Sequence, residues 1–369
     1  MTRVALLCPS LDPGDAVSAD VRGMARVLTD AGYQTEIFAE SWNIPEPVRP
    51  ADTTPDFLKE ETDVLIYHYA FSWKKGRELF ESLHCRKIIK YHNVTPPEFY
   101  APYSARLAER CEESLRMLSE LIHSGADIFA GDSSFNVQDL IDRGAPADRC
   151  RVFAPLHDIP GLLETETDAA TQAEFAHDKN DGRILLMTGR LVPNKGYAAL
   201  LRAFALYRKS YDPEARLILA GRANPELGLY YRELSILLDE LEIRDGAVFA
   251  GAVSAEELKA LYLAADAYVC LSEHEGFCVP LLEAMAFYLP FIALARGAMP
   301  ETAGDGGLIF DEPDPALFAA ALGLLRDKPE ISKQLARAGR LRYETRFTNE
   351  IIGDSLLAVM KEVAPALRP

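Results

Sequence analysis

Apolar strand-like runs and amphipathic helix-like stretches alternate along nearly the whole chain, and this pattern constrains the fold most. "RVALLC" (residues 3–8) is followed by a helix-like stretch that Gly32 closes, and "ILLMTGRL" (184–191) begins a second such series. Continuous apolar strands separated by helices are typical of parallel sheets covered on both faces. The sequence therefore predicts an α/β protein built from doubly wound sheets.

The alternation stops between residues 157 and 182, in an acidic stretch with a Pro-Gly pair and little periodicity. We interpret this stretch as a linker with one helical turn, because 369 residues exceed what one core usually organises. The prediction is two Rossmann-like domains, 1–165 and 180–345, separated by a cleft. A C-terminal helix over 346–369 is expected to pack back toward the first domain.

Charge and cysteine usage exclude several classes of protein. The formal net charge of −17 argues against a nucleic-acid partner. The six cysteines show no C-x-x-C pair, which argues against a disulfide framework or a zinc site and favours a reducing compartment. The N-terminal apolar run is too short for a signal peptide, and no run approaches the roughly 20 residues of a membrane span. We expect a cytoplasmic protein.

One segment, "AFSWKKGRELF" (70–80), combines aromatic and basic residues. Such a segment could lie on the inner face of an anionic membrane, near a lipid-linked acceptor. An ordinary solvated amphipathic helix explains the same pattern and is the favoured interpretation.

Ligands of doubly wound sheets bind at the carboxyl ends of the strands, so polar residues that follow a strand are candidate site residues. The first such place is "TGRLVPNKG" (188–196), where Arg190 and Lys195 precede a helix. Two cations beside free helix N–H groups can hold a diphosphate. The alternative, that both are solvated loop charges, stays open.

The second place is "SEHEGFCVPLLEAM" (272–285), where Glu275 ends a strand and Glu283 lies in the first turn of a helix that contains Pro280. Glu283 could accept hydrogen bonds from ligand hydroxyls, and Gly276 would let the backbone approach the ligand. The alternative is that Glu283 only complements the helix dipole and Glu275 is a turn residue.

The third place is "IIKYHNVTPPEFY" (88–100), in which a strand ends at His92 and Asn93. A histidine at this strand end would face the cleft, although an interior hydrogen-bonded histidine fits equally well. We assign structural roles to His68 and His157. No metal-ligand spacing and no Asp-x-Asp pair occur in the sequence, so no metal is expected.

These residues resemble a known family. "GRLVPNKG", "GAVSAEELKALYLAADAYVCLS" (251–272) and "EGFCVPLLEAM" resemble, in order and spacing, the retaining glycosyltransferases of family 4, or glycosyl transferases group 1. That family has the GT-B fold of two Rossmann-like domains facing each other across a cleft. "YHNVTPPEFY" resembles a bacterial subset that builds surface polysaccharides.

The resemblance implies a role for each candidate. Arg190 and Lys195 would hold the donor diphosphate, Glu283 the ribose, and Glu275 the donor sugar, while His92 would contact the sugar or the acceptor. It assigns further donor contacts to Gly276, Phe277, Cys278 and Val279. The base, uracil or guanine, would be held by backbone near Val253.

One loop departs from the family pattern. Many members have a Gly-Gly pair after the first strand, whereas this chain has Gly14 followed by Asp15. An acid beside a diphosphate is unfavourable, so Gly14 is the weaker donor contact. Asp15, together with Asn93, is assigned to the acceptor side.

The implied reaction moves a hexosyl or deoxyhexosyl group from a GDP- or UDP-linked sugar to an acceptor hydroxyl, with retention and without a cofactor. The acceptor would be a saccharide or lipid-linked saccharide, and the subset favours mannose or a deoxysugar. A GT-B epimerase, a phosphorylase and a non-catalytic partner subunit remain alternatives. A nicotinamide-dependent dehydrogenase does not, because G-x-G-x-x-G is missing after the first strand.

Overall fold

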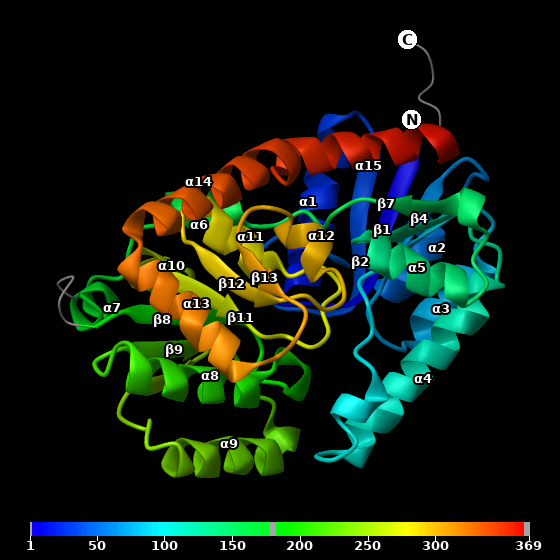
Figure 1. Ribbon diagram of the computed structural model, residues 1–369. Coiled ribbons are helices and arrows are strands. Elements are labelled where there is room, and N and C mark those ends of the chain that lie inside the picture. Colours follow the sequence, from blue (N-terminus) through cyan, green and yellow to red (C-terminus); the bar gives the residue numbers. More distant parts are fainter. Residues whose placement is uncertain (1, 177–181, 365–369) are drawn as a thin grey trace. The chain divides into compact units, whose positions relative to one another are not determined.

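The computed structural model describes residues 2–176 and 182–364, which form two compact units (Figure 1). Unit 1 contains the chain up to Pro97, Arg106–Asp158 and the segment from Phe347 onward. Unit 2 contains Glu98–Ala105 and Ile159–Arg346. The first unit thus gives way to the second after Asp158, not at residue 165, and the C-terminal helix α15 (Asn349–Val363) belongs to unit 1.

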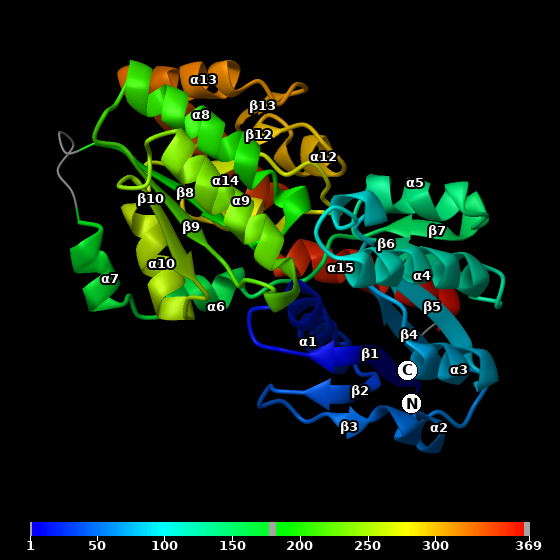
Figure 2. The same ribbon diagram turned by 90° about the horizontal axis from the view of Figure 1, so that it is seen from below.

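Unit 1 is built on a seven-stranded parallel sheet in the order β3-β2-β1-β4-β5-β6-β7 (Figure 2). Its strands are β1 (Arg3–Leu11), β2 (Gln34–Trp42), β3 (Arg49–Pro50), β4 (Val64–Tyr69), β5 (Arg86–Tyr91), β6 (Ile128–Gly131) and β7 (Cys150–Val152). Its helices are α1 (Ala16–Asp30), α2 (Thr54–Phe57), α3 (Lys74–Ser82), α4 (Ala105–Ile122), α5 (Ser134–Asp142) and α15 (Asn349–Val363).

Both faces of this sheet are buried, as the continuous apolar strands predict. Along β1, Ala5 and Leu7 enter one core and Val4 and Leu6 enter the other, because successive side chains point to opposite faces. α3 and α4 contribute to the first core, and α1 and α15 to the second. The doubly wound architecture is confirmed.

Unit 2 has a six-stranded parallel sheet in the order β10-β9-β8-β11-β12-β13. Its strands are β8 (Ile184–Thr188), β9 (Arg216–Ala220), β10 (Ala247–Gly251), β11 (Ala267–Cys270), β12 (Phe291–Leu294) and β13 (Leu308–Phe310). Its helices are α6 (Ile159–Glu164), α7 (Ala169–Glu174), α8 (Tyr197–Ser210), α9 (Gly228–Glu240), α10 (Ala255–Ala264), α11 (Val279–Ala286), α12 (Met299–Ala303), α13 (Pro315–Asp327) and α14 (Pro329–Arg346).

The segment interpreted as a linker is more ordered than its composition suggests. It carries two short helices, α6 and α7, and both contact α10. Ile159 and Leu162 of α6 and Phe175 after α7 are buried, so a few apolar residues anchor the segment to unit 2. Expecting a single helical turn was wrong, because isolated apolar anchors leave no periodic pattern. Residues 177–181 of this segment lie outside the described residues.

The C-terminal segment is tied to unit 1 by His157. Its Nε2–H donates to the Phe347 carbonyl at 2.8 Å, while the Asn349 side chain exchanges two hydrogen bonds with the His157 backbone. Ile352, Leu356 and Met360 of α15 then join the core beside β1. The structural role assigned to His157 agrees with these contacts.

This histidine should make stability depend on pH. Burial lowers the pKa of His157, although its bond to the Phe347 carbonyl opposes the shift. Below about pH 6.5, His157 therefore binds a proton in the unfolded chain but not in the folded chain. The free energy of unfolding falls as the pH drops through that value, by up to about 1.4 kcal/mol per pH unit. We expect a His157→Gln variant to show a shallower loss than wild type between pH 7 and 5.5 in urea-denaturation curves.

The exposed His123 provides the control for this comparison. A His123→Gln variant should keep the wild-type pH dependence. An unchanged pH dependence in the His157→Gln variant would contradict the assignment.

No helix among residues 2–176 and 182–364 is long and apolar enough to cross a membrane. Residues 74–80 of the aromatic and basic segment lie in α3, and Gly76 and Phe80 of this helix are buried in unit 1. These two residues give the apolar part of the segment a partner within the protein, as the solvated-helix interpretation requires.

Candidate functional site

In unit 2, the loop after β8 presents Lys195 at the start of α8. The loop ends in a short 3-10 helix, Pro193–Lys195, and Gly196 then adopts a left-handed conformation with φ 69°. A Cβ at Gly196 would lie 2.0 Å from the Leu271 carbonyl oxygen. Glycine is therefore required here, because the loop after β8 passes directly against the chain that leaves β11.

Lys195 forms an ion pair with Glu275. The prediction that Glu275 ends a strand was wrong, because β11 ends at Cys270 and Glu275 lies in the loop that follows. Lys195 Nζ donates to Glu275 Oε1 at 2.6 Å, and the two side chains are only 14% and 8% exposed. Burial alone would lower the pKa of Lys195, but the Glu275 carboxylate outweighs it and raises that pKa. Lys195 is therefore charged although its side chain is mostly buried. A positive charge with little water around it binds an anion strongly.

Arg190 lies on the same loop and is exposed. Its backbone carbonyl accepts a hydrogen bond from Tyr197 Oη, and its guanidinium makes no ion pair within the described part of the chain. Hydrogen bonds from Leu191 to Arg222, across to the end of β9, hold the loop in place. The Arg190 side chain is therefore available to a ligand at this sheet edge.

The loop from Leu271 to Cys278 is shaped by unusual backbone geometry. Cys278, immediately before α11, has φ 81°, which is uncommon for a residue with a side chain. The Glu275 carbonyl accepts from Ala298 N at 2.9 Å, and a Cβ at Gly297 would lie 2.3 Å from that oxygen. Strained backbone of this kind persists where the surroundings impose it and is frequent at ligand sites.

Glu283 is held by a tyrosine that sequence patterns did not indicate. Tyr262 of α10 donates its hydroxyl hydrogen to Glu283 Oε2 at 2.7 Å, and its oxygen lies 2.9 Å from Thr188 Oγ1 at the end of β8. Burial and the Glu283 charge raise the Tyr262 pKa well above its usual value. The tyrosine therefore remains a donor and fixes one carboxylate oxygen.

The position of Glu283 in its helix differs from the prediction. α11 begins at Val279, with Pro280 in its first turn as expected, and Glu283 is the fifth helical residue. Placing Glu283 in the first turn was wrong, because the helix starts directly after the left-handed Cys278. Half-buried Glu283 is therefore one residue too far along to complement the first turn, which weakens the helix-dipole alternative.

Two other predicted donor contacts occupy the same loops. Phe277 is buried, and its carbonyl accepts from Thr302 Oγ1 at 2.8 Å. Val253 is half-buried in the loop between β10 and α10, after Gly251 with φ 72°. All these loops leave the carboxyl ends of β8, β10 and β11, so one edge of the unit 2 sheet carries every predicted donor residue of this unit.

Two cysteines flank the Glu275 loop. Cys270 and Cys278 are buried, and their thiols and a Glu275 oxygen lie within 4.8 Å of one another. The hydrogen bond between the thiols lowers the pKa of Cys270 and raises that of Cys278. Their spacing along the chain gave no sign of this proximity, because a strand end and a helix start separate them.

In unit 1, Gly14 and Asp15 form the turn between β1 and α1. Gly14 has φ 71° with open space where a Cβ would lie. Asp15 is the N-cap of α1, and its Oδ2 accepts from both the backbone N and the Oγ of Ser18 at 2.9 Å. The capping role accounts for an acid at this position without a ligand.

His92, at the end of β5, has both ring nitrogens engaged inside unit 1. Its Nδ1 lies 3.0 Å from Asp132 Oδ2 and its Nε2 lies 2.9 Å from His68 Nδ1. Its side chain is only 3% exposed. Asn93, the next residue, has φ 72° and donates to the Asn136 side chain at 2.8 Å. A sugar contact through the His92 ring requires one of these bonds to open.

Charged residues surround the two histidines. Lys90 is fully buried, with Nζ 2.7 Å from Asp132 Oδ1 and 2.5 Å from the Phe153 carbonyl. Burial alone would raise the pKa of Asp132, but the neighbouring His92 and Lys90 hold it at about 2. Asp20 of α1 is fully buried, and burial raises its pKa to about 6.

Sequence patterns predicted the donor residues but did not indicate the side chains that support them. Each missed residue contacts a predicted one directly or through one other side chain: Tyr262, Thr188, Asp20, His68, Lys90 and Asp132. Asp132 follows β6 directly, so the strand-end rule that selected His92 could have found it. Nothing in the local pattern of the others could have done so. His68, assigned a structural role, lies against His92 in the structure.

Known proteins resemble this chain in sequence and in fold. Residues 169–342 match the family "Glycosyl transferases group 1". A D-inositol 3-phosphate glycosyltransferase from Thermomonospora curvata is 33% identical over 325 residues, which cover 80% of this chain and 70% of the relative. A protein of the same name from Pseudarthrobacter chlorophenolicus is 28% identical, over 93% of this chain and 91% of its own.

Solved structures agree on the fold. Sucrose-phosphate synthase from Thermosynechococcus elongatus has a TM-score of 0.77 at 20% identity, with 100% of both chains covered. Anabaena HepE, in complex with UDP and glucose, has a TM-score of 0.78 at 17% identity, covering 98% of this chain and 100% of its own. The fold and the donor-side motifs define a glycosyltransferase with the GT-B fold. The chain belongs to the family of glycosyl transferases group 1.

Proposed function

We propose that this glycosyltransferase moves a hexosyl or deoxyhexosyl group from a GDP- or UDP-linked sugar to an acceptor hydroxyl, with retention of configuration. The observation that carries the proposal is the pairing of Lys195 with Glu275, beside exposed Arg190, at one edge of the unit 2 sheet. The pair provides a cation for the diphosphate and a carboxylate for sugar hydroxyls. The complex of HepE with UDP-glucose shows that a protein of this fold binds such a donor.

Charge development explains why cations are needed. The bond between the anomeric carbon and the diphosphate oxygen breaks, the bond to the acceptor oxygen forms, and the acceptor proton passes to a phosphate oxygen of the donor. The leaving diphosphate gains negative charge toward the transition state, so Lys195 and Arg190 bind it more strongly there than in the ground state. In this proposal no metal ion is needed for that charge.

Glu283 is assigned to the ribose hydroxyls. Tyr262 occupies its Oε2 and so orients the carboxylate. The names of the relatives suggest phosphorylated compounds as further acceptors. They include a mannosylfructose-phosphate synthase from Agrobacterium fabrum (31% identical, 65% of this chain and 54% of its own). Assays should therefore include inositol and sugar phosphates beside saccharides and lipid-linked saccharides.

Nucleotide binding tests the proposal. We expect UDP or GDP, at about 100 times its dissociation constant, to add roughly 2.7 kcal/mol of stability, and ADP and dTDP to add less. A Glu283→Ala variant should lose most of this gain, because the ribose hydroxyls lose their acceptor. Thermal-shift curves with each nucleotide measure both effects.

The matched control is Glu312→Ala, which removes an exposed acid from a loop of the same unit. It should keep the full nucleotide response. A folded wild-type protein that responds to none of the four nucleotides would overturn the proposal, and an undiminished response in Glu283→Ala would overturn the role of Glu283.

A further inference from the structure

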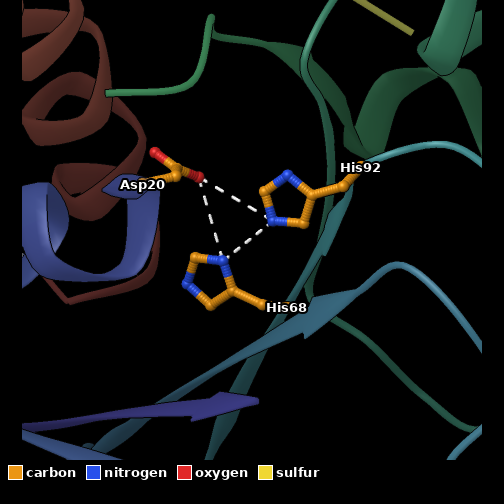
Figure 3. A group of neighbouring side chains, drawn as sticks. All are labelled: Asp20, His68 and His92. Carbon is orange, nitrogen blue, oxygen red and sulfur yellow. Dashed lines mark hydrogen bonds and ion pairs between the residues drawn. The ribbon is translucent and has the colours of Figure 1, made fainter. Parts of the chain in front are cut away.

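Three potential metal ligands converge in unit 1, at the carboxyl ends of β4 and β5. They are His68 Nδ1, His92 Nε2 and Asp20 Oδ2 (Figure 3). The two nitrogens lie 2.9 Å apart, and each lies 3.8 Å from the carboxylate oxygen. In a triangle with these sides, the point equidistant from the corners is about 2.1 Å from each, which matches zinc–nitrogen and zinc–oxygen bond lengths of about 2.0–2.2 Å.

The carboxylate oxygen of this group has no hydrogen-bond donor. Asp20 Oδ1 accepts from the Leu156 backbone N at 2.8 Å, whereas the buried Oδ2 has no hydrogen-bond partner and faces the two rings. The Asp20 side chain is 0% exposed, so bulk solvent does not reach it. A buried carboxylate oxygen left in this state is costly unless a cation neutralises it.

His92 also has the outer support that metal-binding histidines usually have, whereas Nε2 of His68 has no hydrogen-bond partner. Asp132 Oδ2 accepts from His92 Nδ1 at 3.0 Å, which places the proton on Nδ1 and leaves the lone pair of Nε2 directed at the other ligands. A carboxylate behind a ligating histidine fixes the ring and increases its basicity. Lys90, 2.7 Å from the other Asp132 oxygen, keeps that carboxylate ionised and in place.

We propose that Asp20, His68 and His92 bind a divalent first-row transition metal ion, with Zn²⁺ as the best fit. Two imidazole nitrogens and one carboxylate suit zinc and its neighbours, whereas Mg²⁺ and Ca²⁺ take oxygen ligands. The ion would join α1 to the ends of β4 and β5 and so brace the interior of unit 1. It takes no part in the transfer step proposed above.

A proton shared among these three side chains could take the place of the metal ion. His68 Nδ1–H can donate to His92 Nε2, and this hydrogen bond satisfies both ring nitrogens without an ion. The protonated cluster leaves Asp20 Oδ2 aimed at two ring nitrogens and would bind no metal tightly. The two states make opposite predictions for metal binding, and this separates them.

Cobalt binding to the full-length chain is the direct test. Protein stripped with a chelator is titrated with Co²⁺, and visible d–d absorption and isothermal titration calorimetry are recorded. We expect one ion per chain, bands typical of nitrogen and oxygen ligands without the strong thiolate charge-transfer band, and displacement by one equivalent of Zn²⁺. These readouts do not depend on transferase activity, so the proposed function can fail while this proposal stands.

Variants locate the site. Asp20→Asn and His68→Gln should each weaken binding more than 100-fold, and Asp132→Asn should weaken it about 10- to 100-fold through His92. The double variant Cys270→Ser/Cys278→Ser removes the other potential ligand group, and His123→Ala removes an exposed histidine. Both of these controls should bind cobalt as wild type does.

Each result decides between the alternatives. Binding that is lost in Asp20→Asn and kept in the cysteine double variant supports the site. Circular dichroism of each variant reports folding, and if Asp20→Asn does not fold, His68→Gln carries the comparison. Wild-type protein that binds no cobalt above the level of both ligand variants would overturn the proposal, as would binding that disappears only with the cysteines.

Discussion

Replacing Lys195 by glutamine should lower kcat/KM for sugar transfer about 100- to 1000-fold while the protein remains folded. Losing one preorganised group that stabilises developing negative charge typically costs about 3–4 kcal/mol of transition-state stabilisation. The glutamine amide can still donate to Glu275, so the carboxylate is not left without a hydrogen bond. Initial rates over a range of donor concentrations, with circular dichroism to check folding, measure the effect.

The control for this variant is Lys209→Gln, which removes an exposed lysine at the end of α8. Its kcat/KM should match wild type. If Lys195→Gln raised KM for the donor and left kcat unchanged, Lys195 would bind donor and transition state equally, contrary to the role assigned to it. A Glu275→Gln variant, combined with Lys195→Gln in a double-mutant cycle, would show how strongly the two side chains are coupled.

Gly196→Ala should be the most destabilising single-methyl substitution in the loop after β8, at about 3 kcal/mol or more. Left-handed backbone alone costs an alanine roughly 1 kcal/mol. At Gly196 the new Cβ would also meet the Leu271 carbonyl oxygen at 2.0 Å, and backbone on both sides cannot easily move. We expect unit 2 to unfold earlier in urea and Lys195 to lose its alignment with Glu275.

A Gly251→Ala variant separates the cost of the left-handed backbone from the cost of the close contact at Leu271. Gly251 is in the same unit with nearly the same conformation, φ 72°, but nothing lies within 4 Å of where its Cβ would be. Gly251→Ala should therefore cost only about 1 kcal/mol. Urea-denaturation midpoints of the two variants give the comparison, and equal losses of stability would show that the close contact at Leu271 relaxes at little cost.

The sequence was sufficient for the fold because the relevant signals are local. Buried parallel strands are apolar throughout, and helices that cover them are apolar on one face, so both patterns can be recognised in short windows. The same holds for Arg190, Lys195, Glu275 and Glu283, each of which lies in a motif at a strand end or early in a helix. The short helices α6 and α7 escaped prediction because single apolar anchors, not a periodic face, attach them.

Tertiary structure decided how those residues are supported. The strand order places the end of β8 beside β11 and Tyr262 beside Glu283, although these residues are far apart in the chain. In unit 1, His68 lies near the end of β4, His92 and Asp132 directly follow the neighbouring strands β5 and β6, and α1 adds Asp20. No local pattern marks such a group, because each member comes from a separate element. Periodicity along the chain therefore determined the sheets, helices and donor motifs, while strand order and helix packing determined which charged side chains share one buried space.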